Sequence, residues 1–594
     1  MLAVSSCVVV FAMAGGCKIG SPAATVSTPA AAVASVSPGP APVVAVPAEP
    51  VFADPAVAAP AVVGSLLAAA PGKILGDLDA LSQRLSLPIK LGRELLSSLG
   101  SFGFPGGGAH LQAILDRLDA AAPVAIVWVL SEKSRVKGFC AAMTFKESVG
   151  ARRTFDEMGT LGAERNGVSE RRTSDGDLIW GGIKGRTLFI SGSAEALLFA
   201  GALAEKAQIV PPASQVVLTV LPQALAKASG QSPDALVARL ASTMSAAAKS
   251  GQAKLTPAFQ RTSIATAEVM ARLALDSSAI RLLVDAGPRD GFGIRVEAVP
   301  AAGTDFAVRT ARRAPCAFDA RLPVRDDGTA LFALGDLWPM FANWGKLFEA
   351  SGPAGRGFWR DVAKMSDVTV GPSCIVDFTG VAVSTLCSAA LRPGTSPRAA
   401  LDAAVAMLNS QQAWEGELEG RKATPLKIKR SRDMVEIDKK VENKDPMARA
   451  LAKAIAGGDT IKYALSVKDG HLLQAFGRNP RELSSRYGNA TSPKDAPLVA
   501  ATLARTNGAE AVASIDVISF VLRLLGKGNG LPGGPIAAVA GSLPGVAEMK
   551  APFVFTLRGG EALSGEFQIP LGSLDAVAKV VRSVLGSAGG RAPQ

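Results

Sequence analysis

The sequence predicts an α+β fold made of two tandem copies of a mostly antiparallel sheet unit covered by helices. The tetrapeptide Leu75-Gly76-Asp77-Leu78 recurs at Leu334-Gly335-Asp336-Leu337, and each copy is followed by a similar series of strand pairs and helices. Adjacent strand pairs joined by short crossovers favour an antiparallel sheet with helices on its face. Each copy would span about 250 residues, which is within the upper range for a domain.

The composition is that of a folded protein rather than a disordered one. Hydrophobic residues make up 48% of the 594-residue chain, and the mean hydropathy is +0.26. The formal net charge is +12, but the basic residues are dispersed along the chain. The densest basic run, residues 421–440, also contains acidic residues. We therefore interpret this run as a solvated face and expect no nucleic-acid partner.

The front of the chain indicates export. Residues 4–14 form a short apolar core that ends at Gly15-Gly16-Cys17. The stretch Ala14-Gly15-Gly16-Cys17 resembles the lipobox of bacterial lipoproteins. The resemblance implies that residues 1–16 are a signal peptide and that Cys17 carries the lipid. The stretch departs from the lipobox pattern at Ala14, where Leu is usual, and no basic residue precedes Lys18. A plain secretory signal or a chance apolar start is the alternative.

Residues 17–71 are predicted to be a disordered tether. They are rich in Ala, Pro, Val and Ser, and residues 19–48 carry no charge. Such a composition favours a semi-extended chain. Lys18 stands where Asp would retain an enterobacterial lipoprotein in the inner membrane. We therefore expect that the protein is exported and that acyl chains on Cys17 anchor it in the bacterial envelope. The residue after Cys17 favours the outer membrane.

The body is predicted to divide into copy one, residues 72–314, and copy two, residues 315–594. Each copy is expected to run strand–helix, hairpin–helix, hairpin–helix, strand–helix and hairpin–helix. Asp77 and Asp336 are predicted to cap the first helix of each copy. Leu75 and Leu334 are predicted to be buried at equivalent sites. This layout resembles large exported bacterial proteins of unknown function, and that resemblance implies a class of protein rather than a mechanism.

The predicted hairpins are placed by apolar runs that flank short turns. In copy one they cover residues 124–145, 178–190 and 280–299. In copy two they cover residues 374–391, 461–475 and 553–569.

We predict no catalytic, cofactor-binding or metal-binding residue. The chain has only two histidines, His110 and His471, and neither lies at a metal-ligand spacing. The run from Gly528 to Gly533 fits a dinucleotide fingerprint in its letters, but it follows a predicted helix and contains Pro532. Ser134 and Lys137 have the spacing of penicillin-binding enzymes but fall in a hairpin turn.

The cysteines beyond the front segment are Cys140, Cys316, Cys374 and Cys387. If the turn of their hairpin is Gly380-Val381, Cys374 lies opposite Cys387 in a non-hydrogen-bonded pair, where side chains are closest. An exported chain permits a disulfide there. The alternative is that Cys374 and Cys387 are reduced and buried. The redox state of Cys140 and Cys316 stays open.

Three functions are compatible with the sequence. The first is a non-catalytic binding or structural module of the envelope, with a protein, an envelope polymer or a lipid as its partner. The second is a carrier of lipid or another hydrophobic ligand, since apolar inner faces can leave a cavity. The third is a hydrolase that uses only carboxylates such as Asp77 and Asp336. Because no reaction is supported by a motif, we favour the first function and expect that the protein is not an enzyme.

Overall fold

The structure is a computed structural model in which the described residues lie within the compact unit Ala48–Gln594. They are residues 49–52, 61–86, 90–92, 94, 107–130, 137–173, 176–209, 212–230, 232, 235, 238–239, 242, 256–310, 315–324, 329–335, 352–377, 383–442, 449, 452–453, 455–489, 508–520, 545 and 549–589.

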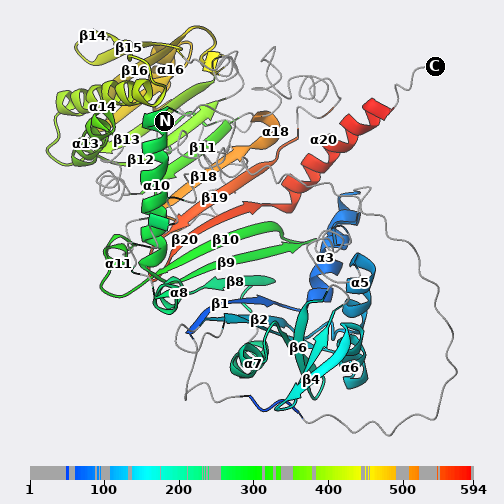
Figure 1. Ribbon diagram of the computed structural model, residues 1–594. Coiled ribbons are helices and arrows are strands. Elements are labelled where there is room, and N and C mark those ends of the chain that lie inside the picture. Colours follow the sequence, from blue (N-terminus) through cyan, green and yellow to red (C-terminus); the bar gives the residue numbers. More distant parts are fainter. Residues whose placement is uncertain are drawn as a thin grey trace, which may run out of the picture. The chain divides into compact units, whose positions relative to one another are not determined.

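The fold is α+β, as predicted from the sequence (Figure 1). The strands are β1 (Ala61–Ala68), β2 (Val124–Leu130), β3 (Lys137–Thr144), β4 (Thr160–Arg165), β5 (Val168–Arg172), β6 (Leu178–Lys184), β7 (Thr187–Ser191), β8 (Val216–Val220), β9 (Ser277–Gly287), β10 (Gly291–Pro300), β11 (Thr329–Leu334), β12 (Thr369–Asp377), β13 (Ser384–Leu391), β14 (Lys427–Arg430), β15 (Met434–Lys440), β16 (Thr460–Lys468), β17 (His471–Phe476), β18 (Ala511–Asp516), β19 (Pro552–Arg558) and β20 (Leu563–Ile569).

The described helices lie between these strands. They are α3 (Pro71–Arg84), α5 (Gly107–Arg117), α6 (Ser148–Glu157), α7 (Ala194–Ile209), α8 (Pro222–Ser229), α10 (Pro257–Leu275), α11 (Asp305–Thr310), α13 (Pro353–Val368), α14 (Pro397–Leu418), α16 (Pro480–Ser485), α18 (Val517–Phe520) and α20 (Leu571–Gly589). In the part of the chain that the structure describes, no helix combines the length and the apolar character needed to cross a membrane.

All strands belong to one 20-stranded sheet in which every neighbouring pair is antiparallel. From one edge the order is β4-β5-β6-β7-β3-β2-β1-β8-β9-β10, and from the other edge it is β14-β15-β16-β17-β13-β12-β11-β18-β19-β20. The two groups meet where β10 pairs with β20, with Ile294 opposite Phe567. Strands nearly three hundred residues apart in the chain are therefore neighbours in the sheet.

The helices cover both faces of the sheet, and the register defines the two faces. The first face carries Cys374, Phe332, Phe555, Ile294 and Val284, which lie in one row across the strands. At one end of the sheet, α5 and α6 pack on this face through a cluster around Phe145 and Phe155. At the other end, α13 and α14 pack on it.

The second face is covered by α7 in the first group of strands and by α16 in the second group. Helix α7 contributes Ala196, Leu197 and Ala200 to a core with Val127 and Phe189. Residues 315–324 cross the second face of the other group and place Leu322 and Val324 in a core with Tyr487, which follows α16. At its outer end, each group of strands is therefore covered on both faces, by helices or by residues 315–324.

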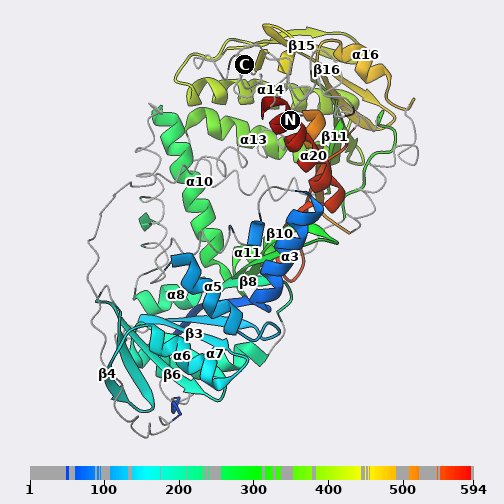
Figure 2. The ribbon, with the colours of Figure 1, turned by 90° about the vertical axis from the view of Figure 1, so that its right-hand side faces the viewer.

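Helix α10 links the two groups of strands. It contacts α8 at one end and α14 at the other, and Figure 2 shows it running between them. Arg261 on α10 pairs with Glu417 on α14 at 3.0 Å. Glu417 also accepts a hydrogen bond from the backbone N–H of Ala354 at the start of α13.

Several predicted elements are confirmed. All six predicted hairpins are present, as the strand pairs β2–β3, β6–β7, β9–β10, β12–β13, β16–β17 and β19–β20. The turn before β17 has positive φ at both Asp469 (50°) and Gly470 (72°), which the tight turns of antiparallel hairpins require. Beyond these hairpins, the structure shows that Ser396 caps α14 by accepting a hydrogen bond from the N–H of Ala399.

The prediction that residues 17–71 are a tether is wrong over its last part. Strand β1 (Ala61–Ala68) lies in the interior of the sheet, where it pairs with both β2 and β8. Its apolar residues continue the Ala- and Val-rich composition of the preceding segment, so composition did not reveal where the strand begins. The predicted boundary at residue 72 therefore excluded a strand of the first group.

The prediction that Leu75 and Leu334 are buried at equivalent sites, with Asp77 as a helix cap, is also wrong. Leu75 and Asp77 lie inside α3, whose N-cap is Ala70, whereas Leu334 is the last residue of β11. Asp336 lies outside the described residues. Leu75 and Leu334 are both only half-buried and belong to different kinds of element. Asp77 does not cap a helix; it accepts a hydrogen bond from the Gln215 side chain at 3.0 Å.

Close packing between α6 and the sheet leads to a first testable prediction. A Cβ at Gly181 in β6 would lie 2.2 Å from the ring of Phe155, which is only 5% exposed. We expect Gly181→Ala to destabilise the protein by about 1–3 kcal/mol, because the ring has no room to move. Gly192→Ala is the control, since its Cβ would meet nothing within 4 Å. Thermal unfolding of both variants checks this, and equal midpoints would contradict the packing.

Candidate functional site

The middle of the sheet has an apolar first face. On β10, β20 and β19, and on β9 from Ile280 to Ala286, every residue of this face is apolar or glycine. We call these residues the central apolar face: Ile280, Leu282, Val284, Ala286, Phe292, Ile294, Val296, Ala298, Leu563, Gly565, Phe567, Ile569, Phe553, Phe555 and Leu557. The cross-strand register places them in continuous rows, because alternate residues of a strand point to the same face.

The second face of the same strands carries charged side chains beside apolar ones such as Leu283 and Val554. Glu297 pairs with Arg281 at 3.6 Å and with Arg295 at 3.2 Å. Arg558 pairs with Glu566 at 3.2 Å. An antiparallel sheet with one polar and one apolar face normally buries the apolar side. Here neither face is simply solvated: Leu283 and Val554 on the second face are buried, whereas the first face is apolar and only half-buried.

The central apolar face is not fully buried. Val296 is 44% exposed and Phe555 is 38% exposed, although both lie in the interior of the sheet. In the register Val296 is opposite Gly565, and the ring of Phe555 lies 3.7 Å from where a Cβ of that glycine would be. Except for Ala286, each residue of this face is only half-buried or exposed. Contiguous exposed apolar surface of this kind is typical of a binding site.

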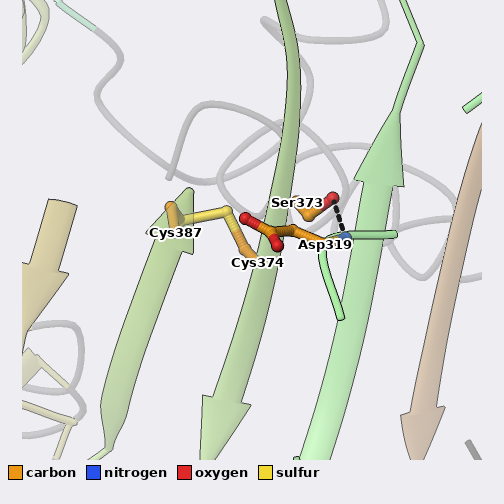
Figure 3. The surroundings of a disulfide bond; sticks show 4 residues. All are labelled: Asp319, Ser373, Cys374 and Cys387. Atoms are coloured by element: carbon orange, nitrogen blue, oxygen red, sulfur yellow. Dashed lines mark hydrogen bonds between the residues drawn. A yellow bond between two sulfur atoms is a disulfide. The ribbon is translucent and has the colours of Figure 1, made fainter. Parts of the chain in front are cut away.

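The predicted cysteine pair forms a disulfide. Cys374 on β12 and Cys387 on β13 are opposite one another in the register and are joined at an S–S distance of 2.04 Å (Figure 3). The turn residues Gly380 and Val381 lie outside the described residues. Both cysteines are almost completely buried.

Reduction of this disulfide is expected to weaken the fold. The cysteines are 13 residues apart. Opening a loop of this size typically lowers the free energy of unfolding by about 3 kcal/mol. Thermal unfolding with and without a thiol reductant checks this. The double variant Cys374→Ala/Cys387→Ala should lose the response to reductant, and an unchanged response in it would assign the effect to other cysteines.

A buried polar cluster lies on the second face, behind the disulfide. Ser388, next to Cys387, points to this face and donates a hydrogen bond to Oδ2 of Asp319 at 2.5 Å. Tyr487 donates to the same oxygen at 2.7 Å. Arg321 donates from Nε to Oδ1 of Asp319 at 2.9 Å. The backbone N–H of Asp319 donates to the hydroxyl oxygen of Ser373 (Figure 3).

The environment of Asp319 holds it ionised. Burial alone would raise the pKa of its carboxyl, but the hydrogen bonds from Arg321, Ser388 and Tyr487 outweigh burial and lower the pKa to about 2. Burial and the bond to Asp319 raise the pKa of the Tyr487 phenol. The guanidinium of Arg321 also lies over the Tyr487 ring, 5.1 Å from its centroid.

His471 lies at the rim of this cluster. Its Nε2 is 2.7 Å from Nη2 of Arg321, and its Nδ1 is 2.9 Å from the carbonyl oxygen of Asp469. Because a guanidinium only donates, Nε2 accepts this hydrogen bond and Nδ1 donates to the carbonyl. Ser388 bonds to Asp319 rather than to His471, so no base is placed on the serine hydroxyl. The geometry is that of a structural tie between residues 315–324 and the sheet.

The Asp319 cluster predicts a specific pH dependence. Because the pKa of Asp319 is lower in the folded protein than in an unfolded chain, its carboxylate stabilises the fold above about pH 4. This contribution is lost as the pH falls towards 2. Asp319→Asn should lower stability at neutral pH and flatten the stability profile between pH 4 and 2. Urea unfolding at a series of pH values measures this, with Asp433→Asn at an exposed turn as the control. Parallel profiles for Asp319→Asn and the wild-type protein would contradict the assignment.

Other candidate residues are not brought into a reactive site. Cys17 lies outside the described residues. Cys140 is buried on β3, and burial raises the pKa of its thiol to about 12. Burial also raises the pKa of Cys316. His110 lies in α5. Within the described residues, no group of three or more His, Cys, Asp or Glu side chains is arranged to hold a metal ion.

Sequence reasoning missed the Asp319 cluster and the exposure of the central apolar face. Nothing in the spacing of Asp319, Ser388 and Tyr487 connects them. The alternation of charged and apolar residues in β9, β10 and β20 was visible, and it signals a sheet with one polar face. It does not signal that the apolar side is left half-exposed.

Comparisons with known proteins give no family. No known protein family matches the chain, and no curated protein matches it. Two solved structures, crystal forms III and IV of TP0453, show some likeness. Form III is 12% identical, with a TM-score of 0.19, over 43% of this chain and 85% of that one. Form IV is 10% identical, with a TM-score of 0.17, over 40% of this chain and 78% of that one. Similarity at this level carries no argument about function.

Proposed function

We propose that the protein is an exported, non-catalytic binding protein that acyl chains on Cys17 hold at the bacterial envelope. The lipobox-like Ala14-Gly15-Gly16-Cys17 is the basis for the anchor. The Cys374–Cys387 disulfide supports export, because disulfides persist mainly outside the reducing cytoplasm.

The half-exposed central apolar face carries the proposal further, towards a lipid or another hydrophobic ligand. Val296 and Phe555 each expose more than a third of their surface, and their neighbours on this face are apolar. Covering the exposed part of these side chains with acyl chains gains roughly 25 cal/mol per Å² of apolar surface removed from water. The sequence-based alternative of a hydrophobic-ligand carrier is therefore the more specific form of the binding function.

We also propose that the body is a tandem duplication, with copies that begin at β1 and β11. The support is the strand order, which is the same from each edge to the middle of the sheet. Equivalent strands β10 and β20 pair antiparallel, as a two-fold axis between copies requires. An experimental structure whose strands β1–β10 superpose on β11–β20 in order would support the duplication. Different strand paths in the two groups would contradict it.

The ligand proposal is tested by mass spectrometry of lipids extracted from protein purified from bacterial membranes. We expect co-purifying lipid in near-equal amount to the protein. Val296→Asp and Phe555→Asp should each weaken binding of a fluorescent fatty acid by at least about tenfold, because they place a charge on the apolar face. The matched control is Leu161→Asp on β4, which is 64% exposed outside this face and should bind as the wild-type protein does.

Two results would contradict the ligand proposal. One is protein free of lipid that also fails to bind the fluorescent fatty acid. The other is a dimer that Val296→Asp dissociates, because a second copy of the chain would then cover the apolar face. Gel filtration of the same variants separates these outcomes from a simple loss of folding.

A further inference from the structure

A second, chemically different site lies at the outer edge of the sheet. A cavity of about 400 Å³ opens on the second face of β14, β15 and β16, beside the start of α16. Its lining residues are Lys427, Lys429, Glu436, Asp438, Lys462, Tyr463, Arg478, Asn479, Pro480, Arg481 and Glu482. Its volume is in the range of small-molecule sites.

The strand register explains why so many charges meet there. Lys427 lies opposite Asp438, and Asp438 lies opposite Lys462 on the next strand. Lys429 lies opposite Glu436. Because alternate residues share a face, the odd-numbered lysines of β14 point to the cavity, and Ile428 and Arg430 point to the first face.

The cations on the two faces of this hairpin differ in whether they form ion pairs. On the first face, Lys439 pairs with Glu415 of α14 at 2.5 Å, and Arg430 pairs with Asp402 of α14 at 2.5 Å. On the cavity side, Arg481 pairs with Glu436 at 3.2 Å. Lys427, Lys429, Lys462 and Arg478 have no carboxylate within ion-pair distance among the described residues. Within the run of residues 421–440, Lys427 and Lys429 are balanced in formal charge by Glu436 and Asp438, so the positive excess of the cavity comes from Lys462, Arg478 and Arg481.

Protection of an edge strand does not account for this arrangement. Lysines on an exposed edge strand such as β14 discourage pairing with another chain. That role needs neither Lys462, which lies two strands inward, nor Arg478, which comes from the loop before α16. It also needs no cavity on the sheet face. Convergence of cations from three separate segments on one hollow is what a polyanionic ligand requires.

We propose that this cavity binds a small molecule with two or more phosphate groups. Lys427 and Lys429 would contact one phosphate, and Lys462 and Arg478 would contact another, since the two pairs come from different segments. Ammonium and guanidinium donors form strong charge-assisted hydrogen bonds with phosphate oxygens. Asp438 lies between Lys427 and Lys462 in the register and repels an anion, so it limits the affinity and favours ligands that span it. This site is independent of the central apolar face.

Isothermal titration of the full chain with inorganic tripolyphosphate tests the site, with inorganic phosphate as the single-group comparison. We expect tripolyphosphate to bind more tightly than phosphate. Lys427→Gln/Lys462→Gln should weaken its binding by at least about tenfold. Asp438→Asn should strengthen it by about threefold, because it removes a repelling charge. A second arm adds vesicles of phosphatidylglycerol and phosphatidylcholine, which show whether a lipid headgroup can supply the phosphates.

The matched control is Arg432→Gln, which removes one charge from the exposed turn of the same hairpin, outside the cavity. It should bind tripolyphosphate as the wild-type protein does. Loss of binding in this control equal to that in Lys427→Gln/Lys462→Gln would overturn the site in favour of general charge attraction. Absence of binding to both tripolyphosphate and the vesicles would also overturn it. Circular dichroism of each variant separates lost binding from lost folding.

Discussion

The pairing of β10 with β20 is the interaction on which the rest of the structure depends. Each group of strands would otherwise end in a long, unpaired edge beside an apolar face, which is an aggregation hazard. The β10–β20 ladder closes both edges at once, from Phe292 opposite Ile569 to Ala298 opposite Leu563. What remains open is the outer edges, β4 and β14. Strand β4 has a register shift between Leu161 and Glu164, and β14 carries lysines; bulges and lysines both discourage pairing at an edge. Both are poor templates for a further strand.

This junction also decides where function can reside. The helices α5, α6, α13 and α14 pack on the first face near the two ends of the sheet, where they form cores. The joined middle strands keep the same apolar alternation but are left half-exposed, as Val296 and Phe555 illustrate. The second face of these strands carries ion pairs such as Arg295–Glu297. One fold therefore presents two different surfaces, an apolar one in the middle and a cationic hollow at the edge by β14.

Local chemistry made part of this structure predictable from the sequence. The Asp469-Gly470 turn and the flanking apolar runs specify their hairpin, and the two apolar runs around Cys374 and Cys387 pair so that these cysteines are opposite one another. The strand β1 was not predictable, because its composition continues that of the preceding segment. The β10–β20 junction and the Asp319–Tyr487 bond join residues far apart in the chain, and no local pattern encodes them. The repeated tetrapeptide was misleading because Leu and Gly are common in this chain. Its recurrence therefore does not show which positions of the two halves are equivalent.

The central claim is that the first face of β10 binds apolar ligands and the second face does not. Alternation gives an internal control, since Val296 and its neighbour Arg295 point to opposite faces. A nitroxide at Val296→Cys or Arg295→Cys, in a Cys316→Ala background, reports exposure to a water-soluble relaxation agent by electron paramagnetic resonance. We predict that added lipid shields the label at position 296 and leaves the label at 295 exposed. Equal shielding at both positions, or none at 296, would contradict the account.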